Sequence, residues 1–203
     1  MQRFFDRADT EWRRPSGCLH FYALPAAGEP LRRDFRSASS ALSAVSGLGR
    51  MPEAYLHVTV QRLDAYADDL ADPRWQAFLE ALGPALQLLP EFEIRFAPPT
   101  VRSHAVEAVG GLSLQWSALV ATIRQTLADA GLRRVLTASP YAPHYTVSYC
   151  VEETDDAVIR QRLEPAAKPS AMRLSTVSLV AVDQDREAGV FSFETVRDWA
   201  LGH

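Results

Sequence analysis

The sequence predicts a mixed α+β fold in which the second half of the chain resembles the first. Predicted elements follow each other in the order strand, helix, strand, helix, strands, and much the same order then repeats. The chain has 203 residues, of which 47% are hydrophobic and 23% charged, as is typical of a globular protein with an ordinary core. This length fits one domain built of two similar lobes, residues 1–203, better than two independent domains.

The first half opens with a short aromatic strand and a helix. The run from Cys18 to Leu24 is rich in β-prone residues and is closed by Pro25, so we expect a strand followed by a turn. From Leu31 to Val45 there is no proline and apolar residues recur at helical spacing. This pattern predicts a helix, which Gly47 should help to end.

A polar-faced strand and a second helix come next. Polar and apolar residues alternate from Tyr55 to Leu63, which predicts a strand with one polar face. Asp72 and Pro73 form a cap and a first-turn proline, and they predict a helix from Trp75 to Leu89. Pro90 stops this helix.

The rest of the chain repeats this pattern and then closes with strands. A second alternating strand again follows a strongly amphipathic helix. The predicted strands are Phe92 to Phe96, Val101 to Val109, His144 to Cys150, Met172 to Asp183 and Val190 to Val196, and the predicted helices are Ser113 to Ala130 and Thr154 to Leu163.

Both alternating strands carry the same pattern, His-x-Thr-Val, at positions 57–60 and 144–147, which are 87 residues apart. Residues two apart on a strand project from the same face, separated by about 7 Å, so each pattern presents an imidazole beside a hydroxyl. Two such pairs suit phosphodiester chemistry. One neutral imidazole takes a proton from the attacking water, the other gives a proton to the leaving oxygen, and the hydroxyls hold the phosphoryl oxygens. This reaction requires no metal.

A single His-x-Thr pattern would be weak evidence for such a site. A lone histidine beside an apolar strand is more often a hydrogen-bonded structural residue than a catalytic one. Two copies in corresponding places of similar halves favour the functional interpretation.

The paired patterns resemble the 2H phosphoesterase superfamily, in particular its bacterial branch of 2′-5′ RNA ligase-like proteins. The strand from Cys18 to Leu24 before Pro25, and Pro143 directly before the second histidine, strengthen the resemblance, which covers most of the chain. It implies a bilobal α+β fold with pseudo-two-fold symmetry. Two antiparallel sheets should flank a central cleft where both motifs meet, with the helices outside.

The resemblance also implies an activity and the residues for it. His57 and His144 match the catalytic histidines of the family, and Thr59 and Thr146 match its phosphate-binding hydroxyls. The implied reaction is hydrolysis of 2′,3′-cyclic or related phosphodiesters of nucleotides or RNA ends, or reversible 2′-5′ ligation in some members. By resemblance, His57 is the acid and His144 the base. A noncatalytic module that binds nucleotides or RNA ends is the alternative from another class.

Two further residues are candidates for substrate binding at the cleft edge. Family members often continue the first motif with an apolar or aromatic pair, whereas this chain has Gln61 and Arg62. Arg62 follows the first motif and Tyr149 the second, so either could reach a phosphate or stack on a base. Strict alternation would place Tyr149 on the face opposite His144, where a core role is equally expected.

Charge and composition limit the partners. The net charge of -4 and the pI of about 5.7 argue against an extended nucleic-acid surface and leave room for a small or terminal phosphate ligand. With the family resemblance, we expect a small nucleotide or an RNA terminus as the substrate. We also expect a monomer. No apolar run approaches the roughly 20 residues that span a bilayer, and the first residues do not resemble a signal peptide. These observations predict a cytoplasmic protein without a membrane partner.

The remaining histidines and the cysteines carry no predicted chemistry. We expect His20 to be structural or on the surface, and we assign no role to His104 or His203. Cys18 and Cys150 are expected to be reduced thiols. No histidine or cysteine cluster has the spacing of a metal site, and no glycine-rich nucleotide motif occurs, so we expect neither a metal nor a cofactor.

Overall fold

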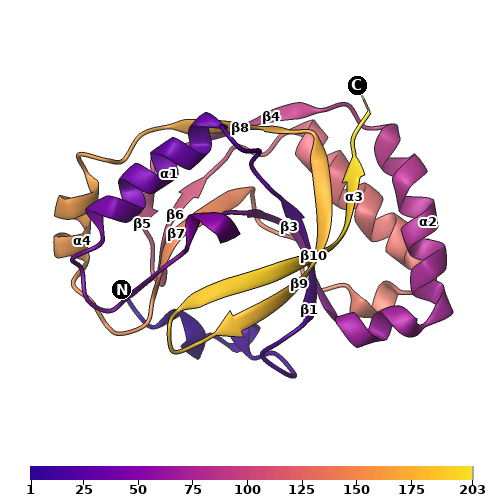
Figure 1. Ribbon diagram of the computed structural model, residues 1–203, viewed down its shortest axis with the longest axis horizontal. Coiled ribbons are helices and arrows are strands. Elements are labelled where there is room, and N and C mark those ends of the chain that lie inside the picture. The colour runs from indigo at the N-terminus through magenta and orange to yellow at the C-terminus, as the bar shows by residue number, and fades with distance from the viewer. Residues whose placement is uncertain (203) are drawn as a thin grey trace.

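The structure, a computed structural model, describes residues 1–202 and contains two four-stranded antiparallel sheets with helices outside them (Figure 1). The strand order is β10-β9-β1-β3 in the first sheet and β2-β7-β6-β5 in the second, and β4 and β8 form a separate antiparallel pair. The strands are β1 (Cys18–Ala23), β2 (Leu48–Arg50), β3 (Val58–Tyr66), β4 (Phe92–Phe96), β5 (Thr100–Val101), β6 (Ala105–Val109), β7 (His144–Cys150), β8 (Ser170–Leu174), β9 (Thr176–Asp185) and β10 (Val190–Ala200).

Four α-helices within residues 1–202 flank the sheets, and Figure 1 shows them in two pairs. Helices α1 (Pro30–Ala41) and α4 (Asp156–Leu163) lie beside the sheet that contains β7, and α2 (Pro73–Gln87) packs on α3 (Leu114–Asp129) beside the other sheet. No helix within residues 1–202 is both long enough and apolar enough to cross a lipid bilayer.

Local sequence explains where the two longest helices begin. The Asp72 carboxylate caps α2 by accepting a hydrogen bond of 2.9 Å from the Arg74 backbone N–H, and Pro73 occupies the first turn. The Ser113 hydroxyl caps α3 by accepting from the Trp116 N–H at 3.0 Å. Both helices bury one apolar face, which contains Trp75, Phe78, Leu82 and Leu86 in α2 and Trp116, Leu119, Ile123 and Leu127 in α3.

The two lobes are interleaved, so neither is built from one half of the chain alone. Strand β2 comes from the first half but pairs with β7, while β9 and β10 come from the end of the chain and extend the sheet of β1 and β3. Helix α1 contacts β7, and α3 contacts β3. The cleft between the lobes therefore depends on the whole chain.

Several element boundaries differ from the sequence-based expectation. The predicted strand Met172 to Asp183 is divided at Ser175, because β8 pairs with β4 whereas β9 pairs with β1. The first helix ends at Ala41, and the short strand β2 was not predicted. Gly49 in β2 approaches the backbone of the β9–β10 turn so closely that a Cβ would lie 2.4 Å from the Ala188 carbonyl oxygen.

The strand that carries the first motif contains a β-bulge. Phe21 pairs with Gln61 and the next residue of β1, Tyr22, pairs with Thr59, so Val60 is an extra residue in β3. The second lobe contains an equivalent bulge within the second motif. Val106 pairs with Ser148 and Glu107 with Thr146, which leaves Val147 as the extra residue in β7. In both motifs the bulge thus falls on the valine after the threonine.

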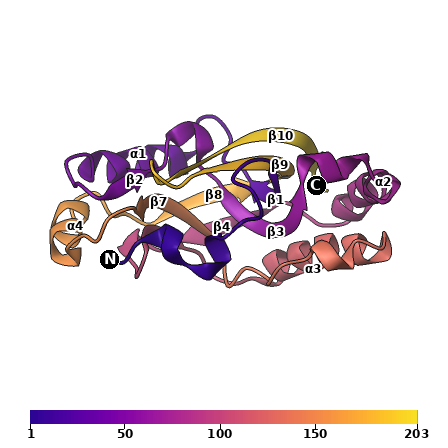
Figure 2. The same ribbon diagram turned by 90° about the horizontal axis from the view of Figure 1, so that it is seen from below.

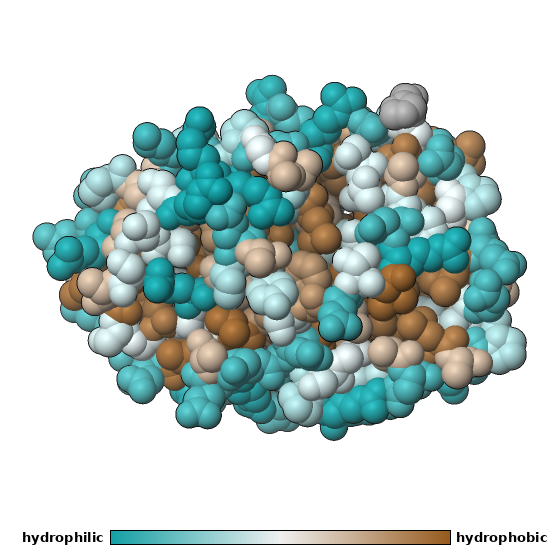
Figure 3. Space-filling model, in the orientation of Figure 1, coloured by the Kyte–Doolittle hydropathy of each residue, from teal (hydrophilic) through white to brown (hydrophobic). Residues whose placement is uncertain are grey.

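On the face shown in Figure 3, hydrophilic residues cover most of the rim and apolar residues gather towards the middle. The cysteines are not linked to each other. Cys18 and Cys150 are both buried free thiols, as expected, and burial raises the pKa of Cys18 to about 12.

Candidate active site

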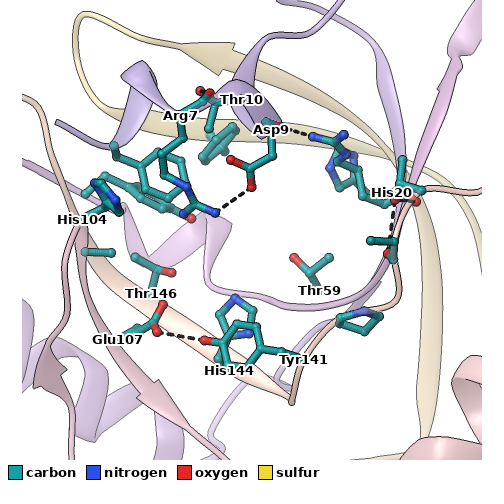
Figure 4. Close-up of a pocket in the computed structure, with 18 of the residues that line it drawn as sticks. Arg7, Asp9, Thr10, His20, Thr59, His104, Glu107, Tyr141, His144 and Thr146 are labelled. Carbon is teal, nitrogen blue, oxygen red and sulfur yellow. Dashed lines mark hydrogen bonds and ion pairs between the residues drawn. The ribbon is translucent and has the colours of Figure 1, made fainter. Parts of the chain in front are cut away.

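Both motifs line one cleft with a volume of about 730 Å³ between the two sheets. His57 and Thr59 line it from the start of β3, and His144 and Thr146 line it from β7. Figure 4 shows Thr59, His144 and Thr146 around the cavity. The structure therefore brings together all four residues that the sequence predicted to share a site.

The two histidines are oriented by the same kind of hydrogen bond, from Nδ1 to a backbone carbonyl oxygen. Nδ1 of His57 lies 2.7 Å from the carbonyl oxygen of Tyr55, and Nδ1 of His144 lies 2.9 Å from that of Ala142. A carbonyl oxygen can only accept a hydrogen bond, so Nδ1 donates in both cases. In each neutral imidazole, Nε2 then carries the free lone pair and is available to exchange a proton.

A tyrosine ring stacks on each catalytic candidate. Tyr22 of β1 is parallel to the His57 ring to within 7°, with the centroids 3.9 Å apart. Tyr141 stacks on His144 at 4.8 Å and 16°, and its hydroxyl donates to the Glu107 carboxylate at 2.8 Å. Figure 4 shows Tyr141 over His144 and its bond to Glu107. The stacks and the Nδ1 bonds together restrict rotation of both imidazoles.

Burial makes His57 difficult to protonate in the ligand-free cleft. The pKa of His57 is lowered to about 4, mainly by desolvation and to a smaller extent by the nearby His144, although the bond to the Tyr55 carbonyl acts in the opposite direction. His57 is therefore a neutral imidazole near pH 7.

The bulges decide which residue follows each threonine on the cleft face. Because each bulge adds one residue, the next cleft-lining position lies three residues after the threonine, at Arg62 in β3 and at Tyr149 in β7. The alternation that placed Tyr149 on the face opposite His144 was therefore wrong. Arg62 and Tyr149 occupy equivalent positions in the two lobes.

Tyr149 also has a packing role, as its burial shows. Its ring is almost fully buried and lies 4.3 Å from the Phe4 ring, centroid to centroid, and 5.2 Å from that of Phe191. Burial raises the pKa of Tyr149 to about 12, and a hydrogen bond with the Thr146 side chain partly opposes this rise. Tyr149 thus joins an aromatic cluster and contacts a motif threonine.

A buried polar network holds the loop that carries Tyr141. Gln61 is fully buried, and its Nε2 donates to the Thr137 hydroxyl at 3.2 Å and to the Ala138 carbonyl at 3.3 Å. Arg124 of α3 donates to Oε1 of Gln61 at 2.8 Å and to the Thr137 carbonyl at 2.9 Å. Gln61, which departs from the common family pattern, therefore anchors residues 137–138 next to the cleft.

Sequence reasoning missed several cleft residues. Arg7, Asp9 and Trp12 line the cleft from the N-terminal segment, far in sequence from either motif, and no motif identified them. Tyr22 had a usable signal, because it lies two residues after His20 on the same predicted strand and shares its face.

The remaining histidines differ in their surroundings. His20 lines the cleft but is 4% exposed, and its Nδ1 donates to the Cys18 carbonyl at 3.2 Å, in line with a structural residue. His104 lies at the cleft rim (Figure 4), and His203 lies outside the described residues. Within residues 1–202, no three His, Cys, Asp or Glu side chains gather in a group that could hold a metal ion.

Comparisons with known proteins agree with this architecture. The fold is similar to the crystal structure of TT0787 of Thermus thermophilus, with a TM-score of 0.69 and 15% sequence identity over 91% of this chain and 97% of that one. It is also similar to E. coli LigT in complexes with NADP⁺ and with 3′-AMP, with TM-scores of 0.65 and 0.64, each at 17% identity over 93% of this chain and 99% of LigT. No curated protein matches the chain by sequence.

The family model of the 2′-5′ RNA ligase superfamily matches residues 29–186, which is most of the chain and includes both motifs. At the identities above, the solved structures establish the fold, whereas this match establishes the family. The chain therefore belongs to the 2′-5′ RNA ligase superfamily, the 2H phosphoesterases, and this family supports a phosphoesterase-type activity in general.

Proposed function

We propose that the protein is a metal-independent phosphodiesterase that hydrolyses 2′,3′-cyclic or related phosphodiesters of nucleotides or RNA ends. One observation carries the proposal. Two histidines, each with Nδ1 bonded to a carbonyl and Nε2 left free, line one cleft together with two threonine hydroxyls. This arrangement supplies a base, an acid and two hydroxyl donors for a single phosphate.

The reaction is a displacement at phosphorus. Nε2 of one histidine accepts a proton as the oxygen of water forms a bond to phosphorus, and the bond from phosphorus to one ribose oxygen breaks. Nε2 of the other histidine, protonated beforehand, gives its proton to that ribose oxygen. The hydroxyls of Thr59 and Thr146 donate to the non-bridging phosphoryl oxygens, where negative charge increases in the transition state.

The environment of His57 favours it as the base. Its lowered pKa keeps it neutral in the ligand-free cleft, and a base must be neutral before it accepts a proton. We therefore assign the base to His57 and the acid to His144. This division is the reverse of the one that the family resemblance suggested.

Hydrolysis of the four nucleoside 2′,3′-cyclic monophosphates in excess EDTA tests the proposal. The wild type should turn over, and His57→Ala and His144→Ala should each lose about 10²- to 10⁴-fold in kcat, the usual contribution of a positioned acid or base. His104→Ala at the cleft rim is the matched control and should retain its activity. Turnover at wild-type rates in either motif variant would contradict the proposal.

Ligation and simple binding are the competing functions, and a ligation assay and a binding assay beside the hydrolysis assay separate them. If wild type hydrolyses no cyclic phosphate but joins RNA ends through a 2′-5′ bond, the two histidines catalyse the reaction in the other direction. Tight binding of 3′-phosphonucleotides without either reaction would instead indicate a noncatalytic nucleotide-binding module.

A further inference from the structure

The N-terminal segment forms the side of the cleft that faces the two motifs. It contains the short 3-10 helices η1 (Phe4–Asp6) and η2 (Ala8–Thr10), and Figure 4 shows Arg7, Asp9 and Thr10 across the cavity from His144. Figure 2 shows this indigo segment in front of β7. This segment lies outside residues 29–186, the range that matches the family model.

Contacts with both lobes fix this segment in place. Phe4 packs on Tyr149 of β7, with the ring centroids 4.3 Å apart, and Phe5 is fully buried at 5.6 Å from Phe191 of β10. The Thr10 carbonyl accepts a hydrogen bond of 3.3 Å from the Gln184 side chain of β9. The side chains that the segment directs into the cleft therefore have a defined position.

Two arginines meet at one residue of this segment. Arg7 forms an ion pair of 2.6 Å with the Asp9 carboxylate, and Arg62 of β3 donates to the backbone carbonyl of Asp9. Within residues 1–202, no carboxylate forms an ion pair with Arg62. The three residues thus carry a net charge of one positive unit at the cleft wall, and the Arg62 guanidinium has spare donors.

We propose that Arg7 and Arg62 bind a second phosphate of the substrate, next to the phosphate at the two motifs. This inference rests on the proposed function and defines its substrate class as nucleotides with at least two phosphate groups. Arg62 is the next cleft-lining residue of β3 after Thr59, which places it about one strand repeat, roughly 7 Å, further along the cleft. That position suits a group on the same nucleotide or on its neighbour.

The existing ion pair does not prevent anion binding. The Asp9 side chain is 58% exposed, and an exposed ion pair of this kind contributes little, so a phosphate can displace the carboxylate into water. Arginine binds phosphate through two parallel N–H donors, and such charge-assisted bonds are stronger than neutral ones. A bare cyclic mononucleotide would leave these donors unused.

Calorimetric titration with product-like ligands tests the subsite without requiring turnover. The probes are adenosine 3′-monophosphate, adenosine 3′,5′-bisphosphate, and the dinucleotide ApA with a 3′-terminal phosphate. We expect at least one two-phosphate ligand to bind about tenfold tighter than the monophosphate, with a preference that weakens as salt rises. If adenosine 3′,5′-bisphosphate binds more tightly than the dinucleotide, the subsite binds a 5′-phosphate. If the dinucleotide binds more tightly, the subsite binds the next phosphodiester.

Variants then assign this preference to the two arginines. The ratio compared is the affinity for the tighter two-phosphate ligand divided by the affinity for the monophosphate. Arg7→Gln and Arg62→Gln should each reduce this ratio towards one, whereas Asp9→Asn should raise it because the competing carboxylate is removed. Arg33→Gln on α1, whose side chain is 74% exposed, is the control and should keep the wild-type ratio. Two results would overturn the inference: a ratio near one in the wild type, or an unchanged ratio in both arginine variants.

The binding and hydrolysis measurements distinguish an error in the second phosphate subsite from an error in the proposed function. If cyclic phosphates are hydrolysed but the affinity ratio is one, only the second phosphate subsite is wrong. If no phosphodiester is hydrolysed and the arginine-dependent ratio persists, the subsite is retained and the proposed catalytic function is wrong.

Discussion

The two motif histidines have the same anchor, and both side chains are partly buried. Each donates through Nδ1 to the carbonyl two residues earlier and lies under a tyrosine ring. Phe193 adds an edge contact to His57, with its ring centroid 5.8 Å away. This aromatic enclosure explains why desolvation is the largest influence on the pKa of His57.

The burial of His57 predicts the acid limb of the pH profile. The pKa of His57 in the free enzyme is about 4, so protonation of the base should cause no decrease in kcat/KM between pH 7 and 5 and should decrease it only near pH 4. An unperturbed imidazole base would instead cause a decrease near pH 6.5. Initial rates with a 2′,3′-cyclic nucleotide, with folding monitored by circular dichroism, measure this. An acid limb near pH 6.5 would show that His57 is not a buried base.

Cleft residues could be predicted from the sequence only where a local pattern on one strand determines their position. The two His-x-Thr pairs could be predicted because both residues lie on one strand and their spacing sets their face. The position of Tyr149 could not, because the bulge at Val147 depends on pairing with β6. Arg7 contributes to the cleft through packing of Phe4 on a strand far away in sequence, and no local pattern indicates such a contact.

At the scale of elements, Gln61 and α3 hold the loop that carries Tyr141. Gln61→Met replaces the amide with an apolar group of similar length. Arg124 then loses its bond to Oε1, and the Thr137 hydroxyl loses the donor from Nε2 while it keeps its own bond to the Arg62 carbonyl. Loss of buried hydrogen-bond partners should lower the free energy of unfolding by about 1–3 kcal/mol. The looser loop should also lower kcat, because Tyr141 stacks on His144.

Urea denaturation and initial rates check this prediction. Gln76→Met is the matched control, because Gln76 is exposed on α2 and its side chain bonds only Glu80 there. The control should change the free energy of unfolding by less than about 0.5 kcal/mol. If Gln61→Met behaves like the control in both measurements, the network does not anchor the loop.

Most elements could be predicted from periodicity, whereas their pairing could not. The strands Phe92–Phe96 and His144–Cys150 have the predicted bounds because apolar and polar residues alternate along them. The division at Ser175 was missed because both sides of it are equally strand-like, and only the choice of partner separates β8 from β9. Strand β2 was missed because a three-residue strand with a central glycine has almost no signal of its own.

At the scale of the whole molecule, buried histidines link stability to pH. Burial lowers the pKa of His20 to about 3, well below its value in an unfolded chain, so the unfolded state binds a proton that the folded state does not. The resulting stability is present above about pH 6.5 and is lost as the pH falls towards 3. His57 acts in the same direction down to about pH 4.

Replacing His20 should therefore weaken the pH dependence of stability. His20→Asn can keep a donor towards the Cys18 carbonyl but does not titrate. Between pH 6.5 and 4, its free energy of unfolding should decrease by about 2 to 3 kcal/mol less than that of the wild type, at roughly 1.4 kcal/mol per pKa unit. Urea titrations at several pH values measure the slope, with His104→Asn as the control. An unchanged slope in His20→Asn would contradict the assignment of a buried neutral imidazole.

The symmetric arrangement of two anchored histidines in interleaved lobes supports the central proposal, which is that one histidine acts as a base and the other as an acid. Hydrolysis of thymidine 3′-(4-nitrophenyl phosphate) tests it most directly, because nitrophenolate leaves without help from an acid. The account predicts that His144→Ala recovers activity with this substrate while His57→Ala stays at least about 10²-fold below the wild type. Equal recovery of both variants, or recovery of neither, would contradict the division of acid and base between the two histidines.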